Sequence, residues 1–295
     1  MLLRGLKNVK KKKRQFGEEK RRKIMEEKTK PQARTRDLGK GSIPKLLAQL
    51  AIPVVVAQIV NLLYNIVDRI YIGHIPGIGA AALTGVGLFA PILMLINAFA
   101  MLSGSGGAPR AAIFMGKKDN ETAEKIMANC FSLILIFAVG LTILFSIFAP
   151  RLLILFGASD ATLPYAVEYA RIYIFGSIFV LIVLGMNLFI TTQGFSKISM
   201  MTTLIGAVIN VILDPIFIFV FDMGVRGAAI ATVLSQAVGA IWVLRFLTGE
   251  KTILKLKLSN MKLNPKVFGP CLALGISSFV MISTESLLSI SFTSS

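Results

Sequence analysis

The chain has 295 residues, of which 55% are hydrophobic and only 16% are charged, and its formal net charge is +17 at pH 7. A water-soluble domain with so few charged residues could not cover its surface, so the composition indicates a membrane protein. The absence of a nucleophile–base pair, a metal-ligand spacing and a nucleotide loop argues against an enzyme. Cys130 and Cys271 lie singly in apolar runs and are predicted to be core residues.

The first segment, residues 1–43, carries basic runs at 10–14 and 20–23 and almost no apolar residues. It cannot bury a core, so we predict a disordered basic cytoplasmic tail. Nucleic-acid binding is one interpretation of such a tail. With spanning helices after it, the favoured one is a flank that orients the protein and touches anionic headgroups, with no nucleic-acid partner. Residues 17–23 suit the purine-rich codons of a ribosome-binding leader, hence our hypothesis that translation starts at Met25.

The first apolar run, residues 46–72, is long enough for a bilayer-spanning helix, which needs about 20 apolar residues. A carboxylate in hydrocarbon costs about 2.5–3.5 kcal/mol on insertion scales, so Asp68 is expected to face a cavity or a partner. Alternatively, Asp68 lies in interfacial water and pairs with Arg69. Four polar residues recur at helical spacing and share one face of this helix: Asn61, Tyr64, Asn65 and Asp68.

Five more full spans and the beginning of a seventh follow, at residues 83–101, 126–149, 169–190, 198–221, 228–247 and 267–295. These spans predict a six-helix membrane lobe over 44–248, a basic cytoplasmic loop over 249–266 and an incomplete seventh helix over 267–295. Lysine and arginine concentrate in alternate connections, which by the positive-inside rule predicts a multi-pass protein of the cell membrane with a cytoplasmic N-terminus.

The early connections carry little recognisable chemistry. His74, the single histidine, is interpreted as a solvated loop residue in preference to a pH sensor. The run at 103–107 is rich in Ser and Gly but lacks the strand and the Gly-Lys-Ser/Thr of a phosphate loop, so it predicts closely approaching helices or a flexible helix end. Residues 116–125 are expected to form a short amphipathic connection.

A second acidic cluster lies at residues 210–215. Asn210 and Asp214 are separated by four residues and therefore lie on one helix face, while Pro215 removes a backbone donor and bends or weakens the helix. Broken helices at membrane depth line cavities and mark ion or substrate sites. The alternative is a helix that ends here and leaves Asp214 near the outer interface. Polar residues also occur in the neighbouring spans, as Asn187, Thr232 and the third intramembrane acid, Glu285.

From residue 42 onward the sequence resembles the multidrug and toxic compound extrusion (MATE) transporters, and most of all their MepA-like bacterial members. The motifs at 64–73, 210–215 and 227–232 are similar to the first, fifth and sixth helices of that family. The resemblance implies an all-α polytopic membrane fold of about twelve helices in two six-helix lobes. This chain would supply the N-lobe and part of a seventh helix, and the C-lobe would be missing.

The resemblance implies a cation-coupled antiporter that uses H⁺ or Na⁺ to export small amphipathic, often cationic, drugs by alternating access, with no cofactor besides the ion. In the DinF-type branch the proton or Na⁺ site uses residues that match Asp68, Asn210, Asp214 and Thr232. Tyr64 and Asn187 match family positions near the cavity that holds this ion site. Asn61 and Asn65 share the Asp68 face, and Glu285 falls where the NorM branch has a glutamate. Two alternatives stay open, a lipid-linked saccharide flippase of the same superfamily and a non-functional fragment.

Overall fold

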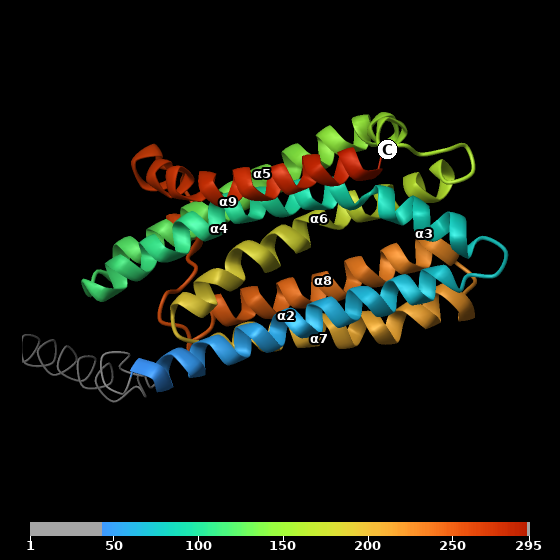
Figure 1. Ribbon diagram of the computed structural model, residues 1–295. Helices are drawn as coiled ribbons and strands as arrows, with labels where there is room; N and C mark the ends of the chain where they lie inside the picture. Colours follow the sequence, from blue (N-terminus) through green and yellow to red (C-terminus); the bar gives the residue numbers. More distant parts are fainter. Residues whose placement is uncertain (1–42, 294–295) are drawn as a thin grey trace, which may run out of the picture. The chain divides into compact units, whose positions relative to one another are not determined.

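The computed structural model of the protein describes residues 43–293, so the predicted basic tail and the hypothesis about Met25 fall on residues outside the described range. Within that range the chain is helical and contains no strand (Figure 1). The elements are α2 (Ile43–Gly73), α3 (Gly79–Leu88), α4 (Ala90–Gly116), α5 (Asn120–Leu155), α6 (Leu163–Thr192), α7 (Ser196–Pro215), the π-helix η1 (Ile216–Val220), α8 (Gly224–Thr248), the 3₁₀-helix η2 (Leu258–Asn260) and α9 (Pro265–Thr293).

Seven spans in the described range are long and apolar enough to cross a membrane. The seventh, Pro265–Ile290, has 26 residues and runs to near the end of the described range. At 1.5 Å per residue it covers about 39 Å, more than the roughly 30 Å of a bilayer core. The all-α polytopic membrane fold itself is confirmed.

The second span is longer than the predicted 83–101 and is made of two helices. α3 ends at Leu88 and α4 begins at Ala90, so Phe89 separates them. Pro91 lies in the first turn of α4, where a missing N–H costs nothing. The Ser/Gly run at 103–107 is part of α4, so it is not a flexible end in this structure.

The connection predicted over 116–125 is mostly helix. α5 begins at Asn120, and only residues 117–119 join it to α4. Asp119 caps α5, because its carboxylate accepts a hydrogen bond of 3.1 Å from the backbone N–H of Thr122. Hydrogen bonds from the side chain and the backbone of Thr122 hold the pKa of Asp119 below its usual value. The misprediction arose because the polar first turns of a helix that extends past the apolar run resemble a loop.

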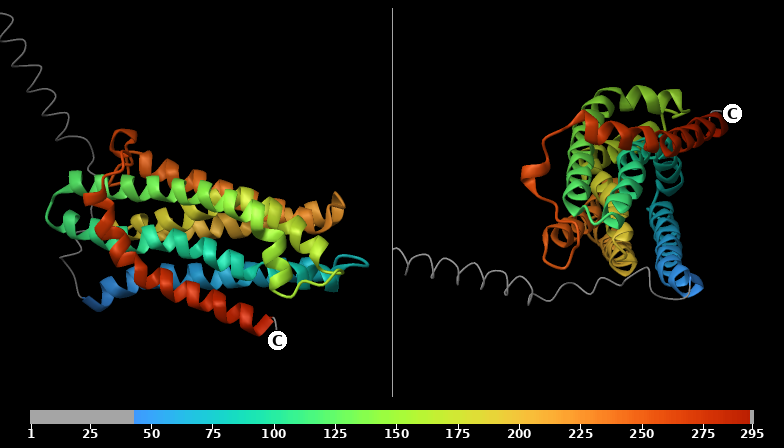
Figure 2. Two further views of the ribbon diagram at one scale, coloured as in Figure 1. Left: turned by 90° about the horizontal axis from the view of Figure 1, so that it is seen from above. Right: turned by 90° about the vertical axis from the view of Figure 1, so that its left-hand side faces the viewer.

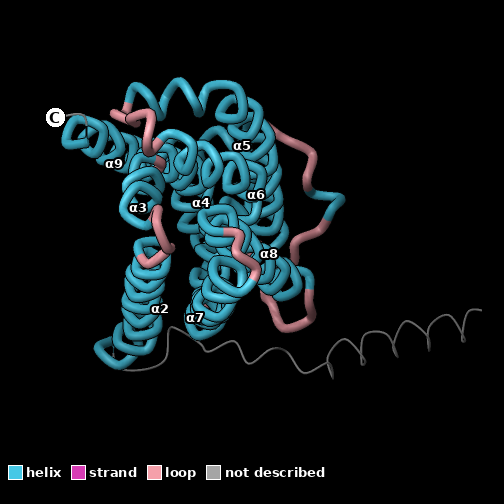
Figure 3. Tube along the Cα trace, turned by 90° about the vertical axis from the view of Figure 1, so that its right-hand side faces the viewer, coloured by secondary structure: helices cyan, strands magenta, loops and turns pink. Residues whose placement is uncertain are grey.

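α6 is the central helix of the described part. It packs against α8, α5 and α4, and in Figures 1 and 3 it lies between the α2, α7 and α8 group and the α4, α5 and α9 group. In the most apolar 18-residue window of each span, the buried share is 61% in α6 and only 6% in α2. α2 therefore lies at the margin, held mainly by α7, and its exposed face is rich in Val, Ile and Leu.

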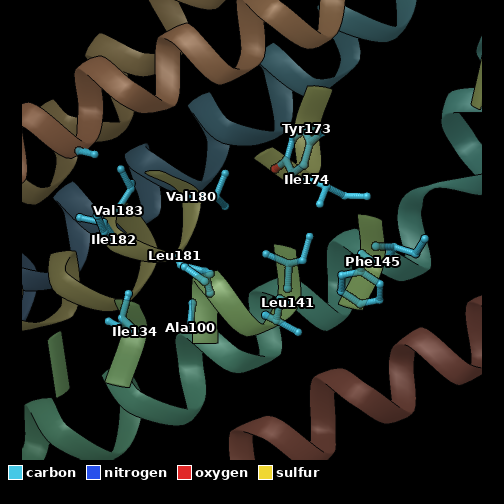
Figure 4. Packing of buried hydrophobic residues seen from close by; sticks show 14 of the residues in the cluster. Ala100, Ile134, Leu141, Phe145, Tyr173, Ile174, Val180, Leu181, Ile182 and Val183 are labelled. Carbon is cyan, nitrogen blue, oxygen red and sulfur yellow. The ribbon is translucent and has the colours of Figure 1, made fainter. Parts of the chain in front are cut away.

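The apolar core lies mainly between α4, α5 and α6. Figure 4 shows Leu181 of α6 near Ile134 of α5 and Ala100 of α4, with Leu141 and Phe145 of α5 approaching Tyr173 and Ile174 of α6. These residues are at most 7% exposed. Because lipid is as apolar as this core, tight packing of complementary surfaces must supply much of the association of the helices.

Glycines allow α4 and α9 to approach closely. A Cβ on Gly106 would lie 1.9 Å from the backbone oxygen of Cys271, and a Cβ on Gly275 would lie 1.9 Å from that of Leu102. No side chain fits at either position. The sequence predicted close approach at residues 103–107, and the structure confirms it. Cys130 and Cys271 are free and buried, as expected of core residues.

The segment between α8 and α9, residues 249–264, is an ordered strap along other helices. Gln193 at the end of α6 holds its first part, since its Oε1 accepts hydrogen bonds from Thr252 Oγ1 and from the backbone N–H groups of Ile253 and Leu254, at 2.8, 2.9 and 2.8 Å. The first turns of α5 hold the rest. Glu124 accepts from the backbone N–H of Lys255 and pairs with Lys257.

Two further residues of α5 bind the end of the strap. Asn129 accepts from the N–H of Asn264 at 2.8 Å and donates to the carbonyl of Asn260 at 3.3 Å. The hydroxyl of Ser132 donates to the carbonyl of Met261 at 2.8 Å. The loop predicted from charge alone is therefore fastened at both ends by buried polar groups. Sequence reasoning found no role for Glu124, because its partners lie more than 130 positions away.

We expect Gln193→Leu to release the strap, because three donors would lose one shared acceptor. An unsatisfied buried donor costs about 1–3 kcal/mol. Hydrogen–deuterium exchange should show faster exchange at the amides of Ile253 and Leu254 and unchanged exchange in the α5–α6 core. Gln193→Glu keeps the accepting oxygen and should retain most of the protection. Equal protection in the Leu variant would show that Gln193 does not hold the strap.

Candidate functional site

The site is built around two acids from different helices. α2 packs along α7, which brings Asp68 of α2 next to Asp214 of α7. Their carboxyl groups are close enough to share a hydrogen bond. Two ionised carboxylates are acceptors only, so such a bond requires one proton between them.

Asn210 links the acid on α7 to the neighbouring helix α8. Its Nδ2 donates to Asp214 Oδ1 at 3.1 Å and to Thr232 Oγ1 at 3.4 Å. The hydroxyl of Thr232 in turn donates to the carbonyl of Ala228 at 3.0 Å. Asn210, Asp214 and Thr232 are at most 7% exposed. The side chains are therefore held in place by a network that spans α7 and α8.

Three oxygens of this network are buried and have no hydrogen-bond donor among the described residues: Asp68 Oδ1, Asp214 Oδ2 and Asn210 Oδ1. Buried acceptors are nearly always satisfied in folded proteins, because an unpaired one carries the full cost of desolvation. A proton, a cation or a water molecule would satisfy acceptor oxygens of this kind. The donor set, which consists of carboxylate, amide and hydroxyl oxygens, also suits a hard monovalent cation.

Aromatic residues surround the acids. Tyr64, one turn before Asp68 on α2, is close enough to both acids to interact electrostatically, and Tyr169 of α6 lies within hydrogen-bonding reach of Thr232. Tyr169 stacks on Tyr173 with ring centroids 5.9 Å apart, and Phe89 meets both rings edge to face. This wall lowers the local dielectric and strengthens electrostatic interactions inside it.

The backbone after Asp214 explains why the acid lies within a span and not at its end. Pro215 cannot donate a backbone hydrogen bond, and the chain continues as the π-helix Ile216–Val220 instead of stopping. Asp214 is completely buried. The helix therefore does not end at Asp214, and the change from α-helix to π-helix at Pro215 fits the predicted bend or weakening there.

The structure does not bring every predicted site residue to this cluster. Asn187 donates to the carbonyl of Ser199 at 3.3 Å, and Ser199 lies 15 positions before Asp214, about 22 Å away along the helix axis. Asn65 is exposed and its amide bonds back to the carbonyl of Asn61, on its own helix. Glu285 is exposed on α9, which packs on α4 and α5. Asn187 and Glu285 are therefore not part of the acid-pair network.

Sequence reasoning missed Tyr169, Tyr173 and Phe89. A tyrosine or phenylalanine in an apolar span is usually a packing residue, and the sequence has no pattern that would place these three next to Asp68. One signal was available: Tyr169 and Tyr173 are separated by four residues, so their rings lie on one face of a helix.

Asp68 and Arg69, the alternative pair, form no ion pair in the described residues, where three other ion pairs occur.

These features define the class of protein. The described part of the chain has seven membrane-capable spans and a buried acid pair with unsatisfied oxygens, a combination typical of ion-coupled membrane transporters. Comparison with known families agrees, since the model of the MatE family matches residues 53–216, more than half of the chain. The chain belongs to the MatE family.

The relatives of the chain include multidrug exporters. The chain is 24% identical over 241 residues to the multidrug export protein MepA of Staphylococcus haemolyticus and 26% identical over 243 residues to that of Staphylococcus saprophyticus. Each alignment covers 82% of this chain and 53% of the relative, so the chain spans about half the length of these proteins.

A solved structure shares the fold. It is described as the outward-facing conformation of a multidrug resistance MATE family transporter of the MOP superfamily, and it superposes with a TM-score of 0.79 at 28% identity. The match covers 86% of this chain and 56% of that one.

Proposed function

We propose that the complete protein is a cation-coupled antiporter that exports small amphipathic, often cationic, drugs. The observation that carries the proposal is the set of three unsatisfied buried oxygens on Asp68, Asp214 and Asn210. The acid pair would take up H⁺ or Na⁺, and no other cofactor is needed. The relatives named for multidrug export support the choice of drugs as substrates.

Each residue of the network has a role in this proposal. Asp68 and Asp214 would bind the coupling ion directly, as a shared proton or as carboxylate ligands of Na⁺. Asn210 would orient Asp214 through its Nδ2 and offer its Oδ1 to the ion, and the Thr232 hydroxyl would complete the oxygen set. Burial makes ion binding favourable, because the bound ion neutralises charges that are otherwise desolvated.

The structure suggests how ion binding would affect conformation. α2 is the least buried of the spans and is attached mainly to α7, where its partner acid lies. It contains Pro53, which weakens the helix ladder, and α7 passes into a π-helix after Pro215. Neutralising the acids removes their mutual repulsion, so α2 would repack against α7 and narrow the drug cavity. Two lobes would then alternate access to this cavity.

We also propose an orientation for the lobe in the cell membrane. The connections at residues 117–119 and 193–195 and the strap lie at one end of the helices and carry most of the described lysines. The connections at the other end, residues 74–78, 156–162 and 221–223, carry none. By the positive-inside rule the lysine-rich end, called the basic end below, would face the cytoplasm, and so would the N-terminus.

Transport by the complete protein in proteoliposomes tests the function. We expect export of a cationic dye when an opposing H⁺ or Na⁺ gradient is imposed, and no export without a gradient. Imposing the two gradients separately identifies the coupling ion. Export that needs neither gradient would contradict the antiporter proposal, and movement of a lipid-linked saccharide instead of the dye would favour the flippase.

A further inference from the structure

The strap, residues 249–264, combines positive charge with exposed leucines. Its sequence contains Lys251, Lys255, Lys257 and Lys262 and one acid, Glu250, and Lys266 follows in the first turn of α9. Only Lys257 has an ion-pair partner described in the structure, Glu124. The strap therefore keeps an excess of positive charge beside the helices.

Two leucines of the strap are exposed, although another leucine of the same strap is buried. Leu258 is 84% exposed and Leu263 is 41% exposed. Leu254, whose backbone N–H donates to Gln193, is fully buried. Each exposed leucine is next to a lysine, Lys257 and Lys262. Leucine alternating with lysine is typical of segments that lie at the boundary between headgroups and acyl chains.

The strap lies beside the helices and not across their ends. In the two end views, the right panel of Figure 2 and Figure 3, it passes outside the helices on the α5 and α8 side. Its contact with Ser132 is 12 residues into α5, about 18 Å from the first turn. A segment that runs laterally along a spanning helix, near the start of its apolar part, is surrounded by lipid headgroups.

We infer that the strap is a binding site for anionic phospholipids in the leaflet at the basic end. The ammonium groups of Lys262 and Lys266 would pair with a lipid phosphate, and Leu258 and Leu263 would contact the acyl chains of that lipid. The hydrogen bonds from Gln193, Asn129 and Ser132 hold the strap in this position before lipid arrives, so little conformational entropy is lost on binding. The inference depends on the membrane location and not on the drug-export proposal.

The test measures lipid retention by the complete purified protein. Phosphatidylglycerol and phosphatidylcholine are titrated in detergent and the bound lipid is counted by native mass spectrometry. We expect phosphatidylglycerol to bind more tightly, and Lys262→Gln combined with Lys266→Gln to weaken it by about fivefold for each lysine removed. Inorganic phosphate at the same concentration should not displace it, because phosphate lacks the acyl chains that contact the leucines.

The matched control removes two positive charges elsewhere at the same end. Lys117→Gln combined with Lys118→Gln changes the connection between α4 and α5 by the same charge and should leave phosphatidylglycerol binding within twofold of wild type. Leu258→Ser should weaken both lipids. An equal loss in the control would show that net charge alone attracts the lipid, and no loss in the strap variants would show that lipid binds elsewhere. Either result overturns the inference.

Discussion

Asp68→Asn and Asp214→Asn are each expected to reduce drug export by the complete transporter to background. Both changes keep the shape of the side chain but remove the negative charge that binds the coupling ion. The protein should still fold, because an amide costs less to bury than a second carboxylate beside the first. We therefore expect both variants to express and unfold at the wild-type temperature or above. Export in proteoliposomes, measured beside thermal unfolding, checks both halves of the prediction.

A neighbouring acid provides the control. Asp222 lies in the connection that follows the π-helix, is exposed, and has a φ of 51°, a left-handed conformation that asparagine also adopts readily. Asp222→Asn makes the same chemical change outside the network and should export like wild type. If Asp68→Asn exported at the wild-type rate, the acid pair could not be the coupling site.

Gly275→Ala is expected to destabilise the packing of α9 on α4. The new methyl group would lie 1.9 Å from the backbone oxygen of Leu102 and 2.8 Å from its carbonyl carbon. A backbone atom cannot move aside as a side chain can, so the helices must separate. Overpacking of this kind typically costs about 1–3 kcal/mol. Thermal unfolding of the purified protein should show a lower midpoint.

Gly140→Ala, in the interior of α5, is the matched control, since a Cβ there meets no atom of another helix within 4 Å. It should leave the unfolding midpoint unchanged or raise it, because alanine is favoured over glycine in a helix interior by about 0.5–1 kcal/mol. Equal midpoints for the two alanine variants would mean that the α4–α9 contact does not contribute to stability.

Local sequence patterns were sufficient to predict the spanning helices of the fold. The apolar runs predicted the spanning helices, because a segment in lipid must satisfy its backbone groups within itself and therefore forms a helix. Pro215 predicted the break in the helix, and the spacing of Asn210 and Asp214 predicted that they share a face. The prediction failed at the start of α5, whose polar first turns resemble a loop, and the contacts of the strap were not predicted because its partners are remote in sequence.

The sequence by itself determined that this is an all-α membrane protein with acids buried in two spans, because composition and periodicity are local properties. Only the tertiary structure decided which of those acids meet. Asp68 and Asp214 are 146 positions apart, and they lie together because α2 packs on α7. Glu285, an equally isolated acid in an apolar run, stays apart because α9 packs on α4 and α5. Which helices pack together depends on the fit of whole surfaces, and no single motif encodes that fit.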